Sequence, residues 1–116
     1  MKVAHYTEAK AKVFDTAPAK GVTARVVIGK ADGASNFCMR VFELAEGGHT
    51  PLHVHDWEHE IFIHSGEGNV YRDGTWVPIN KGHTLFIPAN EEHQIKNSGN
   101  GTLTLVCLIP SGAPEI

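Results

Sequence analysis

Residues 48–64 read GHTPLHVHDWEHEIFIH, and they hold five of the eight histidines of this 116-residue chain. His53 and His55 lie two positions apart, so an extended strand would direct both rings to the same face. His59 follows four positions later, after a segment in which a short turn could swing it toward the first two rings. Imidazole is the most common side-chain metal ligand, and three convergent rings therefore predict a metal site.

The composition is that of a single soluble domain, residues 1–116, with 41% hydrophobic and 20% charged residues. A formal net charge of -3 and the lack of a Lys/Arg cluster argue against a nucleic-acid partner. No apolar run is long enough to cross a membrane or to form the core of a signal peptide. Cys38 and Cys107 stand alone inside strand-like segments, which favours buried free thiols and a reducing cytoplasm.

Short segments with β-strand character fill the rest of the chain. Residues 1–20 are predicted to form an N-terminal arm with one short strand or helical turn over residues 9–14. The sequence Asp73-Gly74 is a strong hairpin signal, and Glu46-Gly47-Gly48 is expected to end a strand. Strands are predicted over residues 22–28, 37–44, 61–63, 70–72, 75–77, 84–87, 93–96 and 102–110. Such spacing predicts an all-β domain, an antiparallel sandwich or barrel.

Two groups of residues have spacings that match a known pattern. Residues 47–66 fit G-x5-H-x-H-x3,4-E-x6-G, and residues 82–97 fit G-x5-P-x-G-x2-H-x3-N. These spacings resemble the two conserved motifs of the cupin superfamily. The resemblance implies a single cupin domain, a jelly-roll β-barrel of antiparallel strands, and it makes His93 the fourth ligand beside the first three histidines.

The chain departs from the pattern at two positions. Asn90 replaces the glycine of the second motif, a mild change because Asn tolerates a positive φ. His59 stands in the glutamate position of the first motif, while Glu60 lies one residue later and would serve if the longer spacing applied. If His59 points inward, Ile61 and Ile63 share its face, which suits a barrel core better than an inward Glu60. We therefore favour His53, His55, His59 and His93 as the metal ligands, with Glu60 as the alternative to His59.

The segments GVTARVVIG, NFCMRVFELAEGG, WEHEIF and CLIP further resemble small single-domain bacterial cupins with four histidine ligands. That resemblance implies a divalent transition metal such as manganese, a homodimer in which the N-terminal arm could cross to its neighbour, and a dioxygenase-like activity. Nitrogen ligands alone do not decide between Mn, Fe, Ni, Cu and Zn. Without thiolates the site is unlike closed structural zinc sites, and a six-coordinate metal would keep two positions open for a substrate or dioxygen.

Several other residues have two interpretations each. Arg40 could face the barrel and anchor an acidic substrate, although an outward, solvated side chain is the favoured interpretation. Glu58 and Glu60 could accept hydrogen bonds from ring N–H groups, or could be exposed carboxylates. Trp57 could cover the barrel or contact a partner subunit. The residues Leu103, Leu105 and Cys107 share a strand face that could line the pocket or pack in the core.

The sequence is compatible with three hypotheses about function. The first hypothesis is a metal-dependent oxygenase acting on a small organic molecule, with no catalytic side chain assigned. The alternatives are a metal- or ligand-binding module without catalysis and a sugar isomerase or epimerase. The last would require more polar and basic groups facing the cavity than this sequence offers beyond Arg40.

Overall fold

The computed structural model describes residues 1–116 and contains nine strands and two short 3-10 helices. The helices are η1 (Tyr6–Glu8) and η2 (Lys30–Asp32). The strands are β1 (Lys12–Phe14), β2 (Lys20–Ile28), β3 (Phe37–His49), β4 (His59–Ser65), β5 (Glu67–Arg72), β6 (Thr75–Asn80), β7 (Thr84–Ile87), β8 (His93–Lys96) and β9 (Leu103–Pro110). The all-β prediction is confirmed, and β7 and β8 have the predicted bounds.

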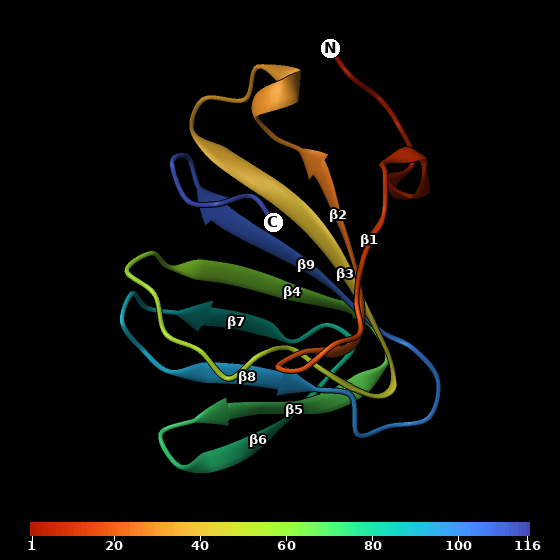
Figure 1. Ribbon diagram of the computed structural model, residues 1–116, viewed down its shortest axis with the longest axis vertical. Helices are drawn as coiled ribbons and strands as arrows, with labels where there is room; N and C mark the ends of the chain where they lie inside the picture. The colour runs from red at the N-terminus through yellow and green to blue at the C-terminus, as the bar shows by residue number, and fades with distance from the viewer.

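All paired strands are antiparallel and belong to one sheet with the order β6-β5-β8-β3-β9-β4-β7, to which β2 adds beside β3 and β1 beside β2. Figure 1 shows the strands stacked from β2 at the top to β6 at the bottom. Although β6 and β7 lie at opposite ends of this order, Ile79 of β6 and Ile87 of β7 belong to one buried cluster. The sheet therefore curls into the barrel that the motif spacing predicts.

The interior of the barrel is clearest on β4, where buried and exposed side chains alternate strictly. On β4, Ile61 and Ile63 are buried while Glu60 and Phe62 are exposed, because successive side chains of a strand leave opposite faces. The buried apolar cluster draws on strands all around the barrel: Val22, Cys38, Leu44, Ile61, Ile63, Val70, Ile79, Ile87, Ile95, Leu103, Leu105, Cys107 and Ile109. Both cysteines are buried free thiols, as predicted.

The prediction that Glu46-Gly47-Gly48 ends a strand is wrong, since β3 continues to His49. Between the pairs Val22–Leu44 and Lys20–His49, β3 contains more residues than β2, and the excess forms a bulge. Gly47 has φ of 73° there, and Gly48 packs so closely that an added Cβ would lie 2.8 Å from the backbone oxygen of Ala45. After the bulge, β3 contacts β8 as well as β2, and His49 pairs with Lys96 of β8.

Two local predictions about turns agree with the structure. Asp73 and Gly74 both have positive φ, 48° and 77°, and join β5 to β6 as a tight hairpin. Asn90 has φ of 67°, the left-handed conformation that the motif glycine would supply. The arm contains η1 and then β1, which pairs with β2 of the same chain.

Candidate metal centre

The four predicted histidines come from three segments that meet at one end of the barrel. His59 is the first residue of β4 and His93 is the first residue of β8. His53 and His55 lie on the connection between β3 and β4, which is tied down at two points. An isolated bridge joins His53 to His93 through reciprocal backbone hydrogen bonds of 3.1 and 3.0 Å, and the N–H of Asn90 donates to the carbonyl of His55 at 2.7 Å.

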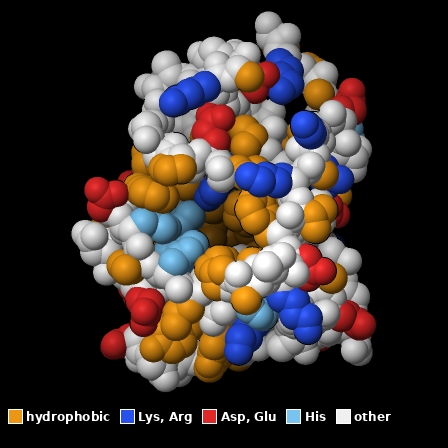
Figure 2. All heavy atoms as spheres, in the orientation of Figure 1, with side chains coloured by type: hydrophobic (Ala, Val, Ile, Leu, Met, Phe, Trp, Pro, Cys, Tyr) orange, Lys and Arg blue, Asp and Glu red, His pale blue; other side chains and the backbone are white.

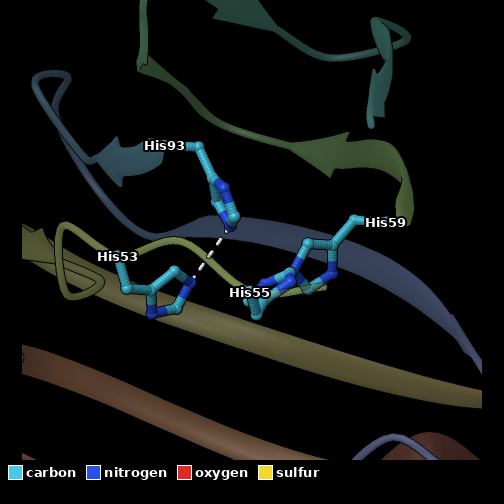
Figure 3. A group of neighbouring side chains, drawn as sticks. All are labelled: His53, His55, His59 and His93. Carbon is cyan, nitrogen blue, oxygen red and sulfur yellow. Dashed lines mark hydrogen bonds between the residues drawn. The ribbon is translucent and has the colours of Figure 1, made fainter. Parts of the chain in front are cut away.

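The structure brings all four rings together, as Figure 3 shows. The Nε2 atoms of His53 and His93 are 3.0 Å apart, and those of His55 and His59 are 2.7 Å apart. One ring nitrogen from each residue lies within 4.8 Å of every other. Nitrogens bound at about 2.1 Å to one metal ion lie about 3 to 4 Å from each other, so this group could hold a metal ion after a small contraction.

In the rings of His55 and His93, the nitrogen that points away from the shared centre makes a hydrogen bond. This bond determines which nitrogen directs a lone pair at the centre. Nδ1–H of His55 donates to the carbonyl of Trp57, and Nδ1–H of His93 donates to the carbonyl of Glu91, each at 2.8 Å. A carbonyl oxygen can only accept, so in the neutral rings both Nε2 atoms carry lone pairs directed at the shared point. Lone pairs that converge in this way require a proton or a cation between them, and the donor set therefore fits a metal ion.

His59 has different surroundings, because its Nδ1 lies inside the barrel. Nδ1 of His59 is 3.0 Å from Sγ of Cys107 and 3.3 Å from a guanidinium nitrogen, Nη2, of Arg40. The same Nη2 donates to Sγ of Cys107 at 3.0 Å. When Nδ1–H of His59 donates to the sulfur, Nε2 is free to face the other rings. His55 is also held by stacking. Its ring is nearly parallel to the ring of Trp57, and the two ring centroids are 4.2 Å apart.

Burial keeps these rings neutral. Desolvation, followed by the charges of neighbouring histidines and Arg40, lowers the pKa of His53 to about 4. Desolvation and then the positive charge of Arg40 lower the pKa of His59 to about 3. The pKa of His55 is also lowered, mainly by burial. Metal binding needs unprotonated nitrogen, and at neutral pH these three rings are already in that form.

The alternative ligand Glu60 points away from the site. Glu60 is exposed on the outer face of β4, whereas His59, Ile61 and Ile63 face inward, as the side-chain alternation predicts. Glu58 is exposed as well, and neither carboxylate bonds to a ring N–H. The hypothesis that these glutamates orient the rings is wrong, because backbone carbonyls and Cys107 take that role. Such partners leave no signature in the sequence.

A cavity of about 200 Å³ adjoins the histidines inside the barrel. Figure 2 shows the hollow, with histidine side chains at one side and hydrophobic side chains lining it. His53, His59 and His93 contribute to its wall, and most of the remainder is apolar: Phe14, Ala19, Val22, Ala24, Phe42, Pro51, Ile61, Ile95, Leu105 and Ile116, with Thr50, Arg40 and Cys107. The volume is below the roughly 300–1,000 Å³ of pockets for drug-sized ligands, and suits a small molecule.

The favoured interpretation that the side chain of Arg40 points to solvent is wrong. Its side chain is buried and lines the cavity instead of pointing to solvent. Its neighbours in the alternation, Cys38 and Leu44, are buried on the same face of β3, and that parity was the available signal. A charged side chain in mid-strand is usually exposed, and the sequence interpretation gave this tendency more weight than the side-chain alternation.

Comparison with known proteins identifies the family. The model of the cupin domain matches residues 40–109, which include both motifs. The polyketide cyclase RemF from Streptomyces resistomycificus is 32% identical, with a TM-score of 0.90 over 98% of this chain and 82% of that one. A predicted oxalate decarboxylase from Thermotoga maritima is 28% identical, with a TM-score of 0.82 over 94% of this chain and 98% of that one.

Two curated relatives match over shorter segments. Auxin-binding protein 1 of Arabidopsis thaliana is 32% identical over 74 residues, 56% of this chain and 37% of that protein. An uncharacterised protein of Methanocaldococcus jannaschii is 37% identical over 62 residues, 53% of this chain and 50% of that protein. The chain thus spans half or less of the length of these two relatives. The strand topology, the two motifs and the match over residues 40–109 together show that this chain belongs to the cupin family.

Proposed function

We propose that this protein binds one divalent transition metal through His53, His55, His59 and His93, and that it is a metal-dependent oxygenase acting on a small organic molecule. The observation that carries the proposal is the convergence of four histidine rings, three of which line an apolar cavity. A metal bound there would supply Lewis acidity and, if it is Fe, Mn or another redox-active ion, the electron exchange that reactions of dioxygen require.

The residues of this chain would prepare the site in three ways. The backbone carbonyls of Trp57 and Glu91 fix two ring tautomers, so that their lone pairs are in place before a metal arrives. Apolar side chains such as Ile61 and Leu105 exclude water from the space beside the rings. The same apolar wall disfavours a sugar isomerase, because a sugar would require several hydrogen-bonding groups there.

A second candidate follows from the similarity to a polyketide cyclase over nearly the whole chain. Ring closure by carbon–carbon bond formation can be assisted by a Lewis acid and needs no electron transfer, so zinc would support it and dioxygen would not be consumed. A third candidate is a binding module in which the metal holds a ligand without turnover. Oxygen consumption separates the oxygenase from the other two candidates, and product formation with zinc separates the cyclase from the binding module.

The test begins with metal-free protein, reconstituted under anaerobic conditions with each of Mn, Fe, Ni, Cu and Zn. Elemental analysis is expected to give one metal per chain. Oxygen uptake is then measured against catechols, flavonoids, diketones and styrenes, and we expect uptake with a redox-active metal and none with zinc. If no metal supports oxygen uptake above background, the oxygenase proposal fails and product analysis with zinc tests the cyclase.

Variants connect the metal to the residues. His53→Ala and His93→Ala each remove one ring and are expected to lose most of the bound metal. His64→Ala is the matched control, because His64 is an exposed residue of β4 on the outer face of the barrel. Full metal occupancy in either cavity variant would contradict the proposed ligand set.

A further inference from the structure

Arg40 is a buried charge without a counter-ion. Only 7% of the residue is exposed, and it is the one Lys, Arg, Asp or Glu among the buried residues. The structure contains two ion pairs, Lys2–Asp32 and Arg25–Glu43, and neither involves Arg40. A buried charge is costly unless it is paired, so a guanidinium held in this way needs a reason.

The contacts of Arg40 satisfy only part of its hydrogen-bonding capacity. Nη1 donates to the backbone carbonyl of Glu115 at 3.3 Å, and Nη2 contacts Cys107 and His59. Nε has no partner. Of the five N–H groups of a guanidinium, at least two are therefore without an acceptor. Glu115 contacts Arg40 through its backbone only, since its carboxylate accepts from the backbone N–H of Lys30 at 2.8 Å.

No acidic side chain faces Arg40 from the cavity. The lining residues include no Asp or Glu. A divalent metal on the four rings would add two further positive charges to the same space. An apolar wall strengthens the attraction between these charges and any anion that enters, because the local dielectric constant is low.

We infer that the cavity recognises a small apolar molecule carrying one carboxylate, and that Arg40 pairs with the carboxylate. The guanidinium fork matches the two oxygens of a carboxylate, which a lysine could not do. Cζ of Arg40 lies over the ring of Phe42, 4.8 Å from its centroid, and Phe42 also lines the cavity, so the apolar body of a ligand would lie next to its carboxylate site. This inference names a substrate class for the proposed function and rests on it only for the added charge of the metal.

The experiment uses benzoate as the probe and benzamide as its neutral counterpart, with binding measured by calorimetry. Metal-free and zinc-loaded protein are both titrated at one ionic strength. Wild-type protein is expected to bind benzoate at least about tenfold more tightly than benzamide in both forms. Arg40→Met removes the charge at similar length and is expected to abolish that preference.

Arg25→Met is the matched control. Arg25 lies on the neighbouring strand β2, is partly buried and carries the same charge, but pairs with Glu43 and does not line the cavity. This variant should retain the full preference for benzoate. Equal binding of benzoate and benzamide by wild-type protein, no binding of benzoate at millimolar concentration, or an unchanged preference in Arg40→Met would each overturn the inference.

A second measurement uses the wild-type protein, so that the inference can be tested even if Arg40→Met does not fold. Benzoate should shift the NMR resonance of the Arg40 Nε–H group, assigned by its absence from the spectrum of Arg40→Lys, and benzamide should not. An unshifted resonance at saturating benzoate would also overturn the inference. Because the metal-free arm requires neither metal nor dioxygen, its result is independent of whether the oxygenase proposal holds.

Discussion

His59 occupies the position where the cupin motif has glutamate, and the consequence is electrostatic. A carboxylate there would neutralise part of the charge of a bound metal, whereas His59 is neutral and lies 3.3 Å from the positive Arg40. The centre thus concentrates positive charge when it is loaded, and when it is empty it contains three rings, His53, His55 and His59, whose pKa values are lowered by burial. Both states should affect the stability of the protein, and the effect in the metal-free protein can be measured without any metal.

The metal-free protein is predicted to lose stability as the pH falls below about 6.5. The folded pKa values of His53 and His59 are about 4 and about 3, while an unfolded histidine titrates near 6.5. Between these limits the unfolded chain binds more protons, so the free energy of unfolding decreases on acidification. Urea unfolding with a chelator present should show a loss of about 1 kcal/mol per ring between pH 7 and pH 5.5.

The double variant His53→Gln/His59→Gln isolates this contribution. Its unfolding free energy should change less between pH 7 and pH 5.5 than that of the wild type, because the two depressed pKa values are gone. A pH dependence equal to that of the wild type would show that other groups govern acid stability.

At the scale of the strand, period-two alternation predicted the orientation of the side chains on β4. It placed His59 inward and Glu60 outward on β4, and the motif spacing selected the four histidines that the structure brings together. Their role as metal ligands stays a prediction. The sequence did not reveal the carbonyl partners of His55 and His93, which lie two residues away and depend on the local backbone conformation. It also did not reveal the continuation of β3 through Gly47 and Gly48, which depends on pairing with the distant strands β2 and β8.

Gly48 offers a test of that continuation. An added Cβ would lie 2.8 Å from the backbone oxygen of Ala45 and 2.9 Å from that of Lys20, and no side-chain rotation relieves a clash with backbone. Gly48→Ala is therefore expected to lower the free energy of unfolding by about 1–3 kcal/mol. The measurement is urea unfolding of the metal-free protein. Ala45→Ser, a small change at an exposed neighbour on the same bulge, should be neutral within about 0.5 kcal/mol.

The bulge directs the chain toward the segment with His53 and His55. A distortion of the bulge should therefore also change the positions of the metal ligands. We expect Gly48→Ala to bind metal more weakly than wild-type protein under conditions where both are folded. Wild-type stability in Gly48→Ala would mean that β3 shifts to make room without cost.

For the whole molecule, the outer surface of the barrel has a largely apolar strip made of Phe62, Phe86, Val106 and Leu108 on the adjacent strands β4, β7 and β9, with the exposed Glu60 between Phe86 and Leu108. Phe62 is 47% and Phe86 is 62% exposed. Apolar patches on soluble proteins commonly mark contacts with partners, and a sheet face can bind a second copy of itself about a two-fold axis. The strip is thus a candidate surface for the homodimer expected from the sequence.

Light scattering on the purified chain should give twice the monomer mass, and Phe62→Glu, which replaces the central apolar side chain by a second carboxylate near Glu60, should shift the protein to monomer. Thr75→Glu adds the same charge at an exposed position of β6, the far edge of the sheet, and should remain dimeric. A monomeric wild type would contradict the dimer itself. A dimer that survives Phe62→Glu would place the interface elsewhere, and since β1 already pairs with β2 of its own chain, an exchanged N-terminal strand would first have to break that pairing.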